Sequence, residues 1–437
     1  MKETKVEDLI CPVCGYHCVG RGGVGCIDKL GMYFKKGDKM NTKNLIDDEN
    51  KYLIQTYKQP AMILDRGERM TVWDIEGNSY VDFIGGIAVN SLGYCHPEIV
   101  KAIGEQSRKI IHCSNLFYQA PQILLAKELV NLSCGDKAFF ANSGAEVNEA
   151  AIKLAIKYFK EQNKEKYKII YMKDSFHGRT IGTLAMTGNY KYQKDYLSIL
   201  AKFQEATFND LDSVKDAYDD NVAAVIVEPV QGEGGIHVAS SSFLQGLREF
   251  CDSKDILLIF DEIQCGLGRT GKMFAYQNYS VEPDILTLAK PLGGGLPLGA
   301  LIAKEKVGKV FHPGDHGTTF GGNPVACAAA LAFLKVLKED KLLPACQKMS
   351  QYFKEKINML KTKYPDYIKD IRIIGLMIGV EVAEKGSEVV GEMTEKGYLI
   401  NCTAGNVLRF LPPLIVQEKD IDGLIDALDE TFKKMEF

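Results

Sequence analysis

Two charged residues, each at the end of an apolar run, have the type and placement to perform chemistry. Asp261 follows the run Ile256 to Phe260, and Lys290 follows the run Ile285 to Ala289. Runs of this length and apolarity are typical of buried parallel strands. Each charged side chain is therefore expected at the carboxyl end of a strand, which is where open α/β sheets bind their ligands.

A buried lysine that faces a buried aspartate is unfavourable unless something occupies the space between them. Pyridoxal phosphate fits that space, because its aldehyde would take Lys290 as a Schiff base and its ring nitrogen would pair with Asp261. The protonated ring would act as an electron sink, and Lys290 would then carry a proton between two substrate-derived carbons. The alternatives are a surface lysine and a capping aspartate, each at the end of a strand.

The stretch Phe139 to Glu146 reads as a strand that passes through a tight turn into a helix. The helix is predicted because apolar residues recur at helical spacing on one face, at Val147, Ala150, Ala151, Leu154, Ala155 and Tyr158. Its amino end, at Ser143, Gly144 and Ala145, would bind the cofactor's phosphate through free N–H groups and the helix dipole. An ordinary serine N-cap is the alternative.

Two further residues are predicted to contact the cofactor ring. Ile263 lies two residues beyond Asp261, so in a strand it would face the same side. Phe176 would stack on the opposite face of the ring, although most phenylalanines are simply buried in a core. Pro291 is expected to hold Lys290 in an extended backbone conformation.

Arg179 and Arg409 are candidates for binding a substrate carboxylate. Arg409 follows Asn406 within the otherwise apolar segment 407–411, and a buried arginine normally has a partner. A guanidinium group matches a carboxylate in two-point geometry. An arginine–carboxylate pair within the protein is the alternative.

The composition is that of an ordinary globular enzyme. The 437 residues are 46% hydrophobic and 25% charged, with a net charge of -4, which favours neither nucleic acid nor an anionic membrane as a partner. No apolar stretch is long enough to span a bilayer, and residues 1–10 do not resemble a secretory signal. The twelve cysteines show no disulfide pattern over most of the chain, so we expect reduced thiols in the cytoplasm.

Short apolar runs alternate with amphipathic helices between about residues 96 and 330, which predicts an α/β fold with a mostly parallel sheet. The strand candidates are Ala138–Phe140, Lys168–Met172, Val222–Val227, Ile256–Phe260 and Ile285–Leu288. A helix is expected from Ala326 to Leu337. The remaining region is expected to be α+β. It would contain helices near 342–362, strands near 371–382 and 406–410, and a helix from Glu418.

Four segments are predicted from these patterns. Residues 1–45 form a cysteine-rich extension and residues 96–330 a large cofactor-binding domain. Residues 46–95 and 331–437 together form a smaller α+β domain built from both chain ends. In the extension, Cys11, Cys14, Cys18 and Cys26 would supply four zinc ligands, but their spacing is not diagnostic. We therefore predict no metal site.

The chain resembles the class III pyridoxal-phosphate aminotransferases of fold-type I over about residues 50–435. The most similar stretches are 82–93, 175–180, 228–235, 260–271, 316–324 and 401–413. Several long motifs in the same order make a chance match improbable. Within the family, the chain is most similar to members that act on N2-acetyl-L-ornithine.

The resemblance implies a role for further residues. Glu233 would pair with Arg409 while a terminal amine is bound, and would move away when the α-carboxylate of glutamate needs Arg409. Arg179 would hold the distal carboxylate in both half-reactions. Gln264 would bind the phenolic oxygen of the cofactor.

Three assignments are also implied by resemblance. Thr319 would reach the phosphate bound by a neighbouring subunit, which implies a homodimer with shared active sites. Tyr57 would touch a substrate carboxylate. Gly86 would leave room for an N-acetyl group where relatives that act on free ornithine carry a tyrosine.

The expected reaction moves the δ-amino group of N2-acetyl-L-ornithine to 2-oxoglutarate, giving N-acetyl-L-glutamate 5-semialdehyde and L-glutamate, as a step of arginine biosynthesis. Other amines remain open: 4-aminobutyrate, ornithine, acetyl-lysine or succinyl-diaminopimelate. A non-catalytic regulatory protein with the same fold is a further alternative, against which the presence of Lys290, Asp261 and Arg179 argues.

Overall fold

The computed structural model describes residues 9–10, 17–18 and 41–435, which form two compact units. The first unit holds the described residues up to Asp65, together with Asp74–Asn78. It contains the paired strands β1 (Leu9–Ile10) and β2 (His17–Cys18) and helix α1 (Thr42–Tyr52). The second unit holds Arg66–Trp73 and the chain from Ser79 onward, and all predicted site residues except Tyr57 belong to it.

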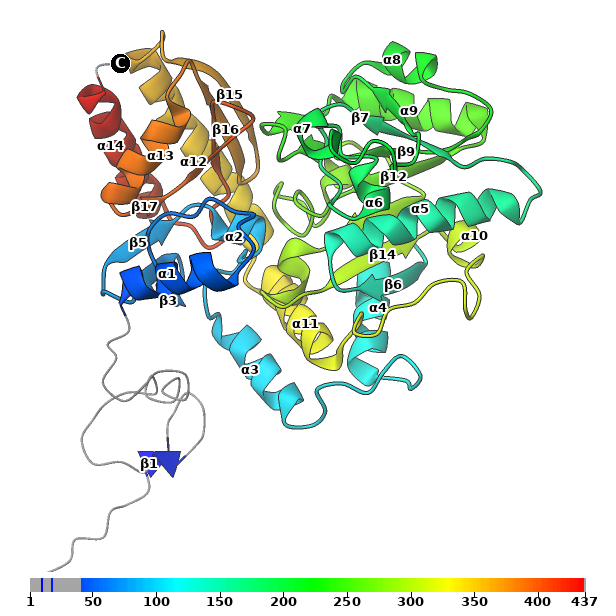
Figure 1. The fold of residues 1–437 in the computed structure, drawn as a ribbon, viewed down its shortest axis with the longest axis horizontal. Coiled ribbons are helices and arrows are strands. Elements are labelled where there is room, and N and C mark those ends of the chain that lie inside the picture. The colour runs from blue at the N-terminus through cyan, green and yellow to red at the C-terminus, as the bar shows by residue number, and fades with distance from the viewer. Residues whose placement is uncertain (1–8, 11–16, 19–40, 436–437) are drawn as a thin grey trace, which may run out of the picture. The chain divides into compact units, whose positions relative to one another are not determined.

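The largest sheet of the second unit has seven strands, and it lies in the right-hand part of Figure 1. Its order is β6 (Lys137–Ala141), β14 (Gly299–Ala303), β13 (Ile285–Leu288), β12 (Leu257–Asp261), β9 (Val222–Val227), β7 (Lys168–Met172) and β8 (Gln204–Ala206). Strand β14 runs antiparallel to both neighbours, and the other four pairs are parallel. The α/β class with a mostly parallel sheet is thus confirmed.

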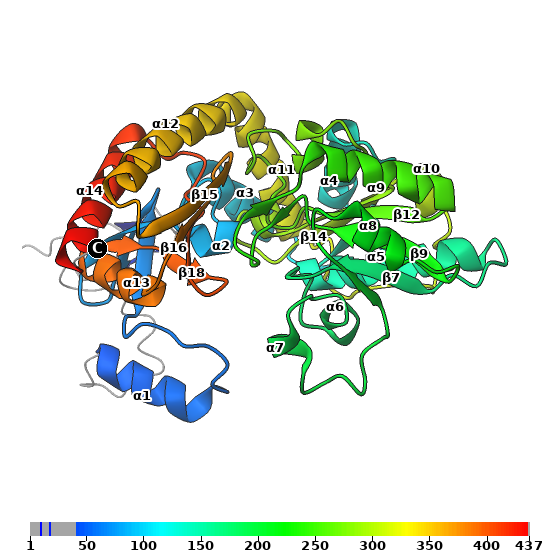
Figure 2. The same cartoon turned by 90° about the horizontal axis from the view of Figure 1, so that it is seen from above.

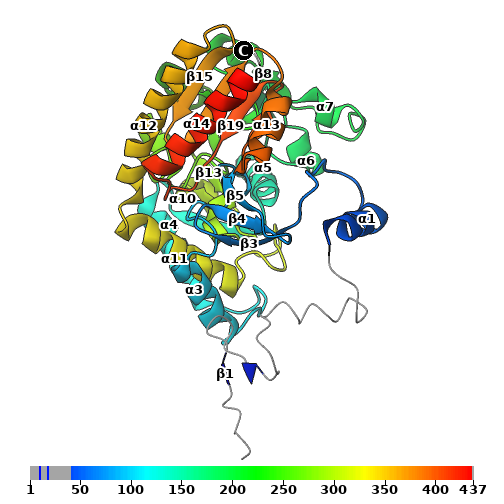
Figure 3. The same ribbon diagram turned by 90° about the vertical axis from the view of Figure 1, so that its left-hand side faces the viewer.

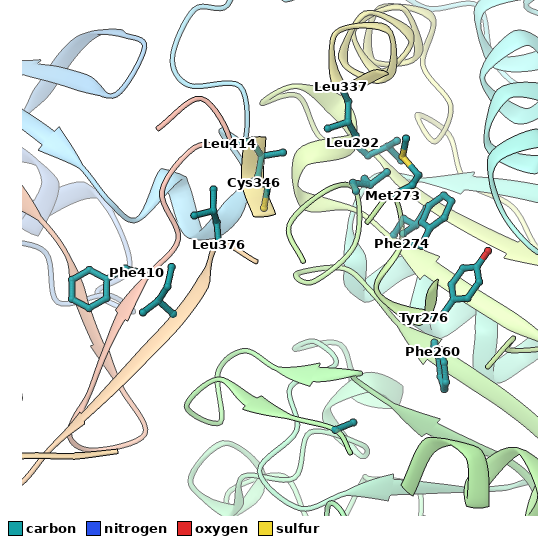
Figure 4. Close-up of a cluster of buried hydrophobic side chains, with 14 of the residues drawn as sticks. Phe260, Met273, Phe274, Tyr276, Leu292, Leu337, Cys346, Leu376, Phe410 and Leu414 are labelled. Atoms are coloured by element: carbon teal, nitrogen blue, oxygen red, sulfur yellow. The ribbon is translucent and has the colours of Figure 1, made fainter. Parts of the chain in front are cut away.

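In strand β12, successive side chains point to opposite faces of the sheet and so contribute to two separate core clusters. Leu257 and Ile259 pack in the cluster that contains the apolar face of α5 (Gly144–Lys160). Leu258 and Phe260 pack on the other face. That face is covered by α4 (Ala120–Leu132), α9 (Ser241–Lys254) and α11 (Pro324–Glu339). Figure 4 shows part of this second cluster, with Phe260 on the sheet and Leu337 on α11.

Side chains of a strand point alternately to the two faces of the sheet, and this alternation also sets the direction of Asp261 at the end of β12. Asp261 continues the series of Leu257 and Ile259, so its side chain faces α5. A sequence pattern that builds the core therefore also aims the carboxylate towards the amino-terminal half of that helix.

A second, antiparallel sheet has the order β15 (Ile368–Ile374), β16 (Met377–Val382), β19 (Val407–Phe410) and β18 (Asn401–Thr403). Helix α12 (Leu342–Lys363) packs on β15, and α14 (Glu418–Lys434) lies beside α12 (Figures 2 and 3). Helix α13 (Gly386–Glu395) packs between α14 and β17 (Tyr398–Leu399). The predicted helices and strands of this region are present, but α13 was not predicted.

A third sheet joins segments from both ends of the chain. Its order is β17, β5 (Ser79–Asp82), β4 (Thr71–Asp74) and β3 (Leu64–Glu68), and β17 pairs in parallel with β5. This pairing agrees with a smaller part of the fold built from both chain ends. The boundaries at residues 45, 95 and 330 remain predictions.

The remaining elements are short or peripheral. They are α2 (Gly85–Ala88), α3 (Pro97–Ser107), α6 (Ile181–Leu184), α7 (Tyr190–Gln193), α8 (Leu211–Asp216), α10 (Glu305–Gly308), β10 (Val230–Gln231), β11 (His237–Val238), and the 3-10 helices η2 (Ala275–Asn278) and η3 (Lys290–Gly293). Among the described helices, none combines the length and apolarity that crossing a bilayer requires. The hypothetical four-cysteine site lies outside the described residues, apart from the backbone of Cys18 in β2.

Candidate cofactor and substrate site

A cavity of about 430 Å³ opens at the carboxyl ends of the parallel strands. Strands β6, β9, β12 and β13 end beside it, and the segment after β7 forms one wall. Of the residues predicted from sequence, those that line it are Ser143, Gly144, Ala145, Phe176, Arg179, Glu233, Asp261, Ile263, Gln264 and Lys290. Residues up to 147 positions apart in the chain therefore meet at one place, as the rule for open α/β sheets predicts.

The carboxylate of Asp261 is held on both oxygens. Its Oδ2 accepts hydrogen bonds from Nδ2 of Asn148 and Nδ1 of His177, each at 2.7 Å, and its Oδ1 accepts the backbone N–H of Ile263 at 3.0 Å. Thr287 donates its hydroxyl to Oδ1 of Asn148 at 2.8 Å, which fixes the orientation of the amide. Asp261 is therefore a buried negative charge with a defined direction.

His177 adds a second titratable group to this network. Burial lowers the pKa of its imidazole, but the hydrogen bond to Asp261 and the charges of Asp261 and Glu228 outweigh burial and raise the pKa. Its Nε2 is buried and has no hydrogen-bond partner within the described part of the chain. His177 was not singled out from sequence, although it lies inside the similar stretch 175–180.

Glu228 is the third buried titratable group of this network, and it was not singled out from sequence. It accepts the backbone N–H groups of Phe176 at 3.0 Å and Gly232 at 3.4 Å. Burial raises the pKa of its carboxyl group to about 7, with His177 opposing and Asp261 adding to the shift. Glu228 directly follows the apolar strand β9, so the signal that identified Asp261 was also present here.

Lys290 differs from its prediction in backbone conformation. It was expected to be extended, but its φ is 31° and it begins the 3-10 helix η3. A non-glycine residue in this region is strained, and such strain often occurs at functional sites. Burial lowers the pKa of the Lys290 amine; Glu233 opposes this shift and Arg409 reinforces it. A lowered pKa increases the fraction of neutral amine, which is the nucleophilic form.

The amino end of α5 forms the narrow side of the cavity. Ser143 is its N-cap, and its Oγ accepts the N–H of Glu146 at 3.2 Å. A Cβ atom added at Gly144 would lie 2.8 Å from Cδ1 of Ile263, so a larger residue here would force the isoleucine side chain to shift. A helix terminus with close backbone access, a buried carboxylate and a lysine of lowered pKa together fit pyridoxal phosphate.

Ile263 reaches the cavity for a different reason than the one predicted. Strand β12 ends at Asp261, so Ile263 lies in the following turn rather than in the strand. The turn is closed by the hydrogen bond between the Ile263 N–H and Asp261. Phe176 is half-buried and lines the same cavity.

Arg409 lies in β19, with only 1% of its side chain exposed, and forms a closed ion pair with Glu233. Its Nη1 is 2.6 Å from Oε1 of Glu233, which also accepts from Nε2 of Gln264 at 3.2 Å. Burial raises the pKa of Glu233, but the positive charges of Arg409 and Lys290 outweigh burial and lower it. Gln264 therefore bonds Glu233 as well as lining the cavity.

Arg179 is exposed at the cavity wall and contacts two aromatic rings. Its guanidinium carbon lies 3.6 Å from the ring centre of Tyr192 and 5.6 Å from that of Phe176. Tyr192 was not predicted to contribute to the site.

Besides Arg409, three predicted residues do not line this cavity. Gly86 lies within a run of left-handed residues from Gly85 to Ala88, and Val89 lines the cavity instead. Thr319 is exposed, whereas its neighbour Thr318 accepts a hydrogen bond from Asn142. Tyr57 is exposed in the first unit. The roles of Gly86, Thr319 and Tyr57 therefore remain predictions.

Comparison with known proteins points to one family. A family model described as aminotransferase class-III matches residues 52–432. An acetylornithine aminotransferase from Methanocaldococcus jannaschii is 52% identical over 91% of this chain and 100% of its own length. The crystal structure of an acetylornithine aminotransferase from Elizabethkingia anophelis is similar, with 33% identity, a TM-score of 0.80, and coverage of 91% of this chain and 100% of its own.

A third relative carries the predicted cofactor in its description. The ornithine aminotransferase of Toxoplasma gondii is 32% identical, with a TM-score of 0.88 over 95% of this chain and 99% of its own, and its structure is described with partial occupancy of PLP at the active site. The match to the family model extends over most of the chain. This protein therefore belongs to the class-III aminotransferase family.

Proposed function

We propose that this aminotransferase moves the δ-amino group of N2-acetyl-L-ornithine to 2-oxoglutarate, giving N-acetyl-L-glutamate 5-semialdehyde and L-glutamate. The relatives named acetylornithine aminotransferase support this choice of substrate. The structural observation that carries it is the closed pair between Glu233 and Arg409 beside an unpaired Arg179. Within residues 41–435, Arg179 takes part in no salt bridge.

Class-III aminotransferases use pyridoxal phosphate, which supplies an electron sink next to the reacting carbon. We propose that Lys290 would hold its aldehyde, Asp261 its ring nitrogen, and the amino end of α5 its phosphate. The anchored carboxylate of Asp261 would stabilise positive charge on the ring. The Lys290 amine, with its lowered pKa, would accept and return the proton that moves during amino transfer.

The two arginines would solve the problem of accepting two different substrates at one place. N2-acetyl-L-ornithine brings one carboxylate, which Arg179 would bind, while Glu233 keeps the charge of Arg409 covered. Glutamate brings two carboxylates, so its α-carboxylate would displace Glu233 from Arg409. Glu233 is the partner able to move, because 29% of its side chain is exposed compared with 1% for Arg409.

We infer that the active form is a homodimer. Leu116, Phe117 and Tyr118 are 87%, 68% and 99% exposed, and Phe320 is 59% exposed. Asn115 bonds the carbonyl groups of Thr318 and Gly321, so these apolar side chains belong to two adjoining loops. An apolar surface of this kind favours a partner, and Thr319 would then be placed to reach the partner's cavity.

The state of the cysteines bears on the cellular compartment in which the protein works. The eight cysteines within residues 41–435 are all free, which supports a reducing compartment. We therefore propose a cytoplasmic enzyme.

Two measurements test these assignments. Borohydride reduction of the holoenzyme followed by peptide mapping should label Lys290, and labelling elsewhere would overturn its role. A panel of amines should show the highest kcat/KM with N2-acetyl-L-ornithine, and a clear preference for free ornithine or 4-aminobutyrate would overturn the substrate. A protein that binds pyridoxal phosphate but transfers no amine would support the regulatory alternative.

A further inference from the structure

Arg179 lacks the polar partners that usually orient an arginine. Within residues 41–435, its guanidinium forms neither a hydrogen bond nor an ion pair. Its contacts are aromatic: Tyr192 at 3.6 Å and Phe176 at 5.6 Å from the guanidinium carbon to the ring centres. The two rings meet edge to face, with centroids 6.3 Å apart and planes at 86°.

We propose that Tyr192 is a positioning residue that holds the Arg179 guanidinium ready for the substrate carboxylate. The proposal rests on the role of Arg179 in the proposed function. At 3.6 Å the guanidinium carbon is in van der Waals contact with the ring, so the cation is bound through its face. The N–H groups in its plane stay free for a carboxylate, which they match in two-point geometry.

An aromatic partner orients Arg179 and leaves its N–H groups available to the substrate, which an acidic partner would not. A carboxylate would orient Arg179 equally well, but it would occupy the N–H groups that the substrate needs. This is the opposite of Arg409, which Glu233 covers until glutamate displaces it. The site thus has one arginine that is open in both half-reactions and one that is covered in the first.

Tyr192 is itself held in place by the chain that follows Arg179. It lies on α7, which is capped by Asn189 through the N–H of Lys191 at 3.1 Å. The buried Gln193 donates from Nε2 to the carbonyl oxygen of Leu184 at 2.9 Å, which ties α7 to α6. Helix α6 begins two residues after Arg179, so the arginine and the ring belong to one short, linked segment.

The test compares Tyr192→Leu, which removes the ring, with Tyr192→Phe, which keeps the ring and removes the hydroxyl. Tyr190→Leu is the matched control, because Tyr190 is on the same helix and 67% exposed. Steady-state kinetics of the holoenzymes would use the best carboxylate-bearing amine and N-acetylputrescine, an amine of the same length that lacks the carboxylate. Calorimetry would measure the binding of glutarate.

For Tyr192→Leu we expect KM for the carboxylate-bearing amine and Kd for glutarate to rise about tenfold, the order of one cation–π contact. Tyr192→Phe should restore most of the affinity, and Tyr190→Leu should behave like the parent. N-acetylputrescine should respond much less to Tyr192→Leu. Unchanged KM in Tyr192→Leu, equal losses in the Leu and Phe variants, or equal losses with both amines would overturn the proposal.

The variant Arg179→Ala distinguishes a failure of the role of Tyr192 from a failure of the role of Arg179. If Arg179 binds the carboxylate, Arg179→Ala should abolish the preference for the carboxylate-bearing amine, and adding Tyr192→Leu should cost nothing further. If Arg179→Ala leaves that preference intact, the role of Arg179 in the proposed function fails. If Arg179→Ala acts as expected but Tyr192→Leu does not, only the role of Tyr192 fails.

Discussion

Oε1 of Glu233 lies 2.6 Å from Nη1 of Arg409, yet the two side chains differ in how firmly they are held. Arg409 is buried and also bonds the carbonyl oxygen of Gly232 at 3.2 Å and Oδ1 of Asn401 at 3.3 Å. Glu233 is partly exposed and bonds Gln264 in addition to the arginine. A substrate carboxylate that competes for Arg409 therefore has to move only one flexible side chain.

Replacing Glu233 by alanine should shift the enzyme towards its dicarboxylate substrates. Arg409 then has no competitor, so we expect KM for glutamate to fall about fivefold, since a partly exposed ion pair contributes about 1 kcal/mol. KM for N2-acetyl-L-ornithine should rise, because an uncovered cation faces that substrate. Single-turnover measurements of the two half-reactions separate these effects. Equal changes in both half-reactions would contradict the role of Glu233 as a switch.

Gly144 should tolerate no side chain while Ile263 is present. The Cβ of alanine at position 144 would lie 2.8 Å from Cδ1 of Ile263, and overpacking of this kind typically costs 1–3 kcal/mol. We expect Gly144→Ala to weaken cofactor binding by about ten- to a hundredfold, measured by titrating the cofactor-free protein with pyridoxal phosphate. The double variant Gly144→Ala/Ile263→Val should recover part of the affinity, because valine lacks the Cδ1 atom but keeps Cγ2, which would lie 3.0 Å from the new Cβ.

Ile263→Val alone is the matched control for this prediction, since Ile263 is also proposed to pack on the ring. Affinity unchanged in Gly144→Ala would show that the turn after β12 adapts freely. A double variant no better than Gly144→Ala would show that the loss arises elsewhere than in the contact with Ile263.

The strands that build the site were predictable because parallel strands buried on both faces are continuous apolar runs. Five such runs matched β6, β7, β9, β12 and β13. Strand β14 was missed, since Gly299–Ala303 follows a glycine-rich turn and its small residues do not distinguish a strand from a loop. Asp261 and Lys290 were identifiable because a charge at the end of an apolar run is conspicuous. Glu228 directly follows the apolar strand β9, so the same sequence signal also marks it as a candidate.

Other features depend on tertiary structure. His177 and Asp261 are 84 residues apart and meet only because β7 and β12 both flank β9. The φ of Lys290 overrides the preference that Pro291 imposes on the preceding residue. Tyr192 lies on a four-residue helix, which is too short to show any periodic pattern. The fold was thus more predictable than the polar contacts that orient its site.

The apolar surface around Tyr118 should be required for assembly. Replacing Phe117 and Tyr118 together by aspartate would place two charges where a partner is proposed to pack, so we expect a monomer in analytical ultracentrifugation. Pyridoxal phosphate should also bind more weakly, because Thr319 of a partner would be lost. Tyr167→Asp is the control, since Tyr167 is 49% exposed and outside this surface. A dimer that persists in the double variant would contradict the assignment of the interface.

Stability should fall as pH rises through neutrality because buried groups retain protons in the folded state, and two of them belong to the network behind the cavity. Burial raises the pKa of Glu228 from 4.5 to about 7. At His177, Asp261 and Glu228 overcome the effect of burial and raise the pKa above 6.5. In both cases the folded chain binds more protons than the unfolded chain, so the free energy of unfolding decreases with pH. The contribution of Glu228 is lost between pH 4.5 and about 7. That of His177 is lost as pH passes its raised pKa.

Urea unfolding of the cofactor-free protein between about pH 5 and about pH 8 measures this slope. Glu228→Gln removes one titrating group, so its unfolding free energy should decline less steeply than that of the parent, whatever the absolute cost of the substitution. The matched control, Glu395→Gln, changes an exposed carboxylate and should leave the slope as it is. Parallel curves for the parent and Glu228→Gln would mean that Glu228 is already ionised at pH 5, and that the network behind the cavity carries one more negative charge than its burial implies.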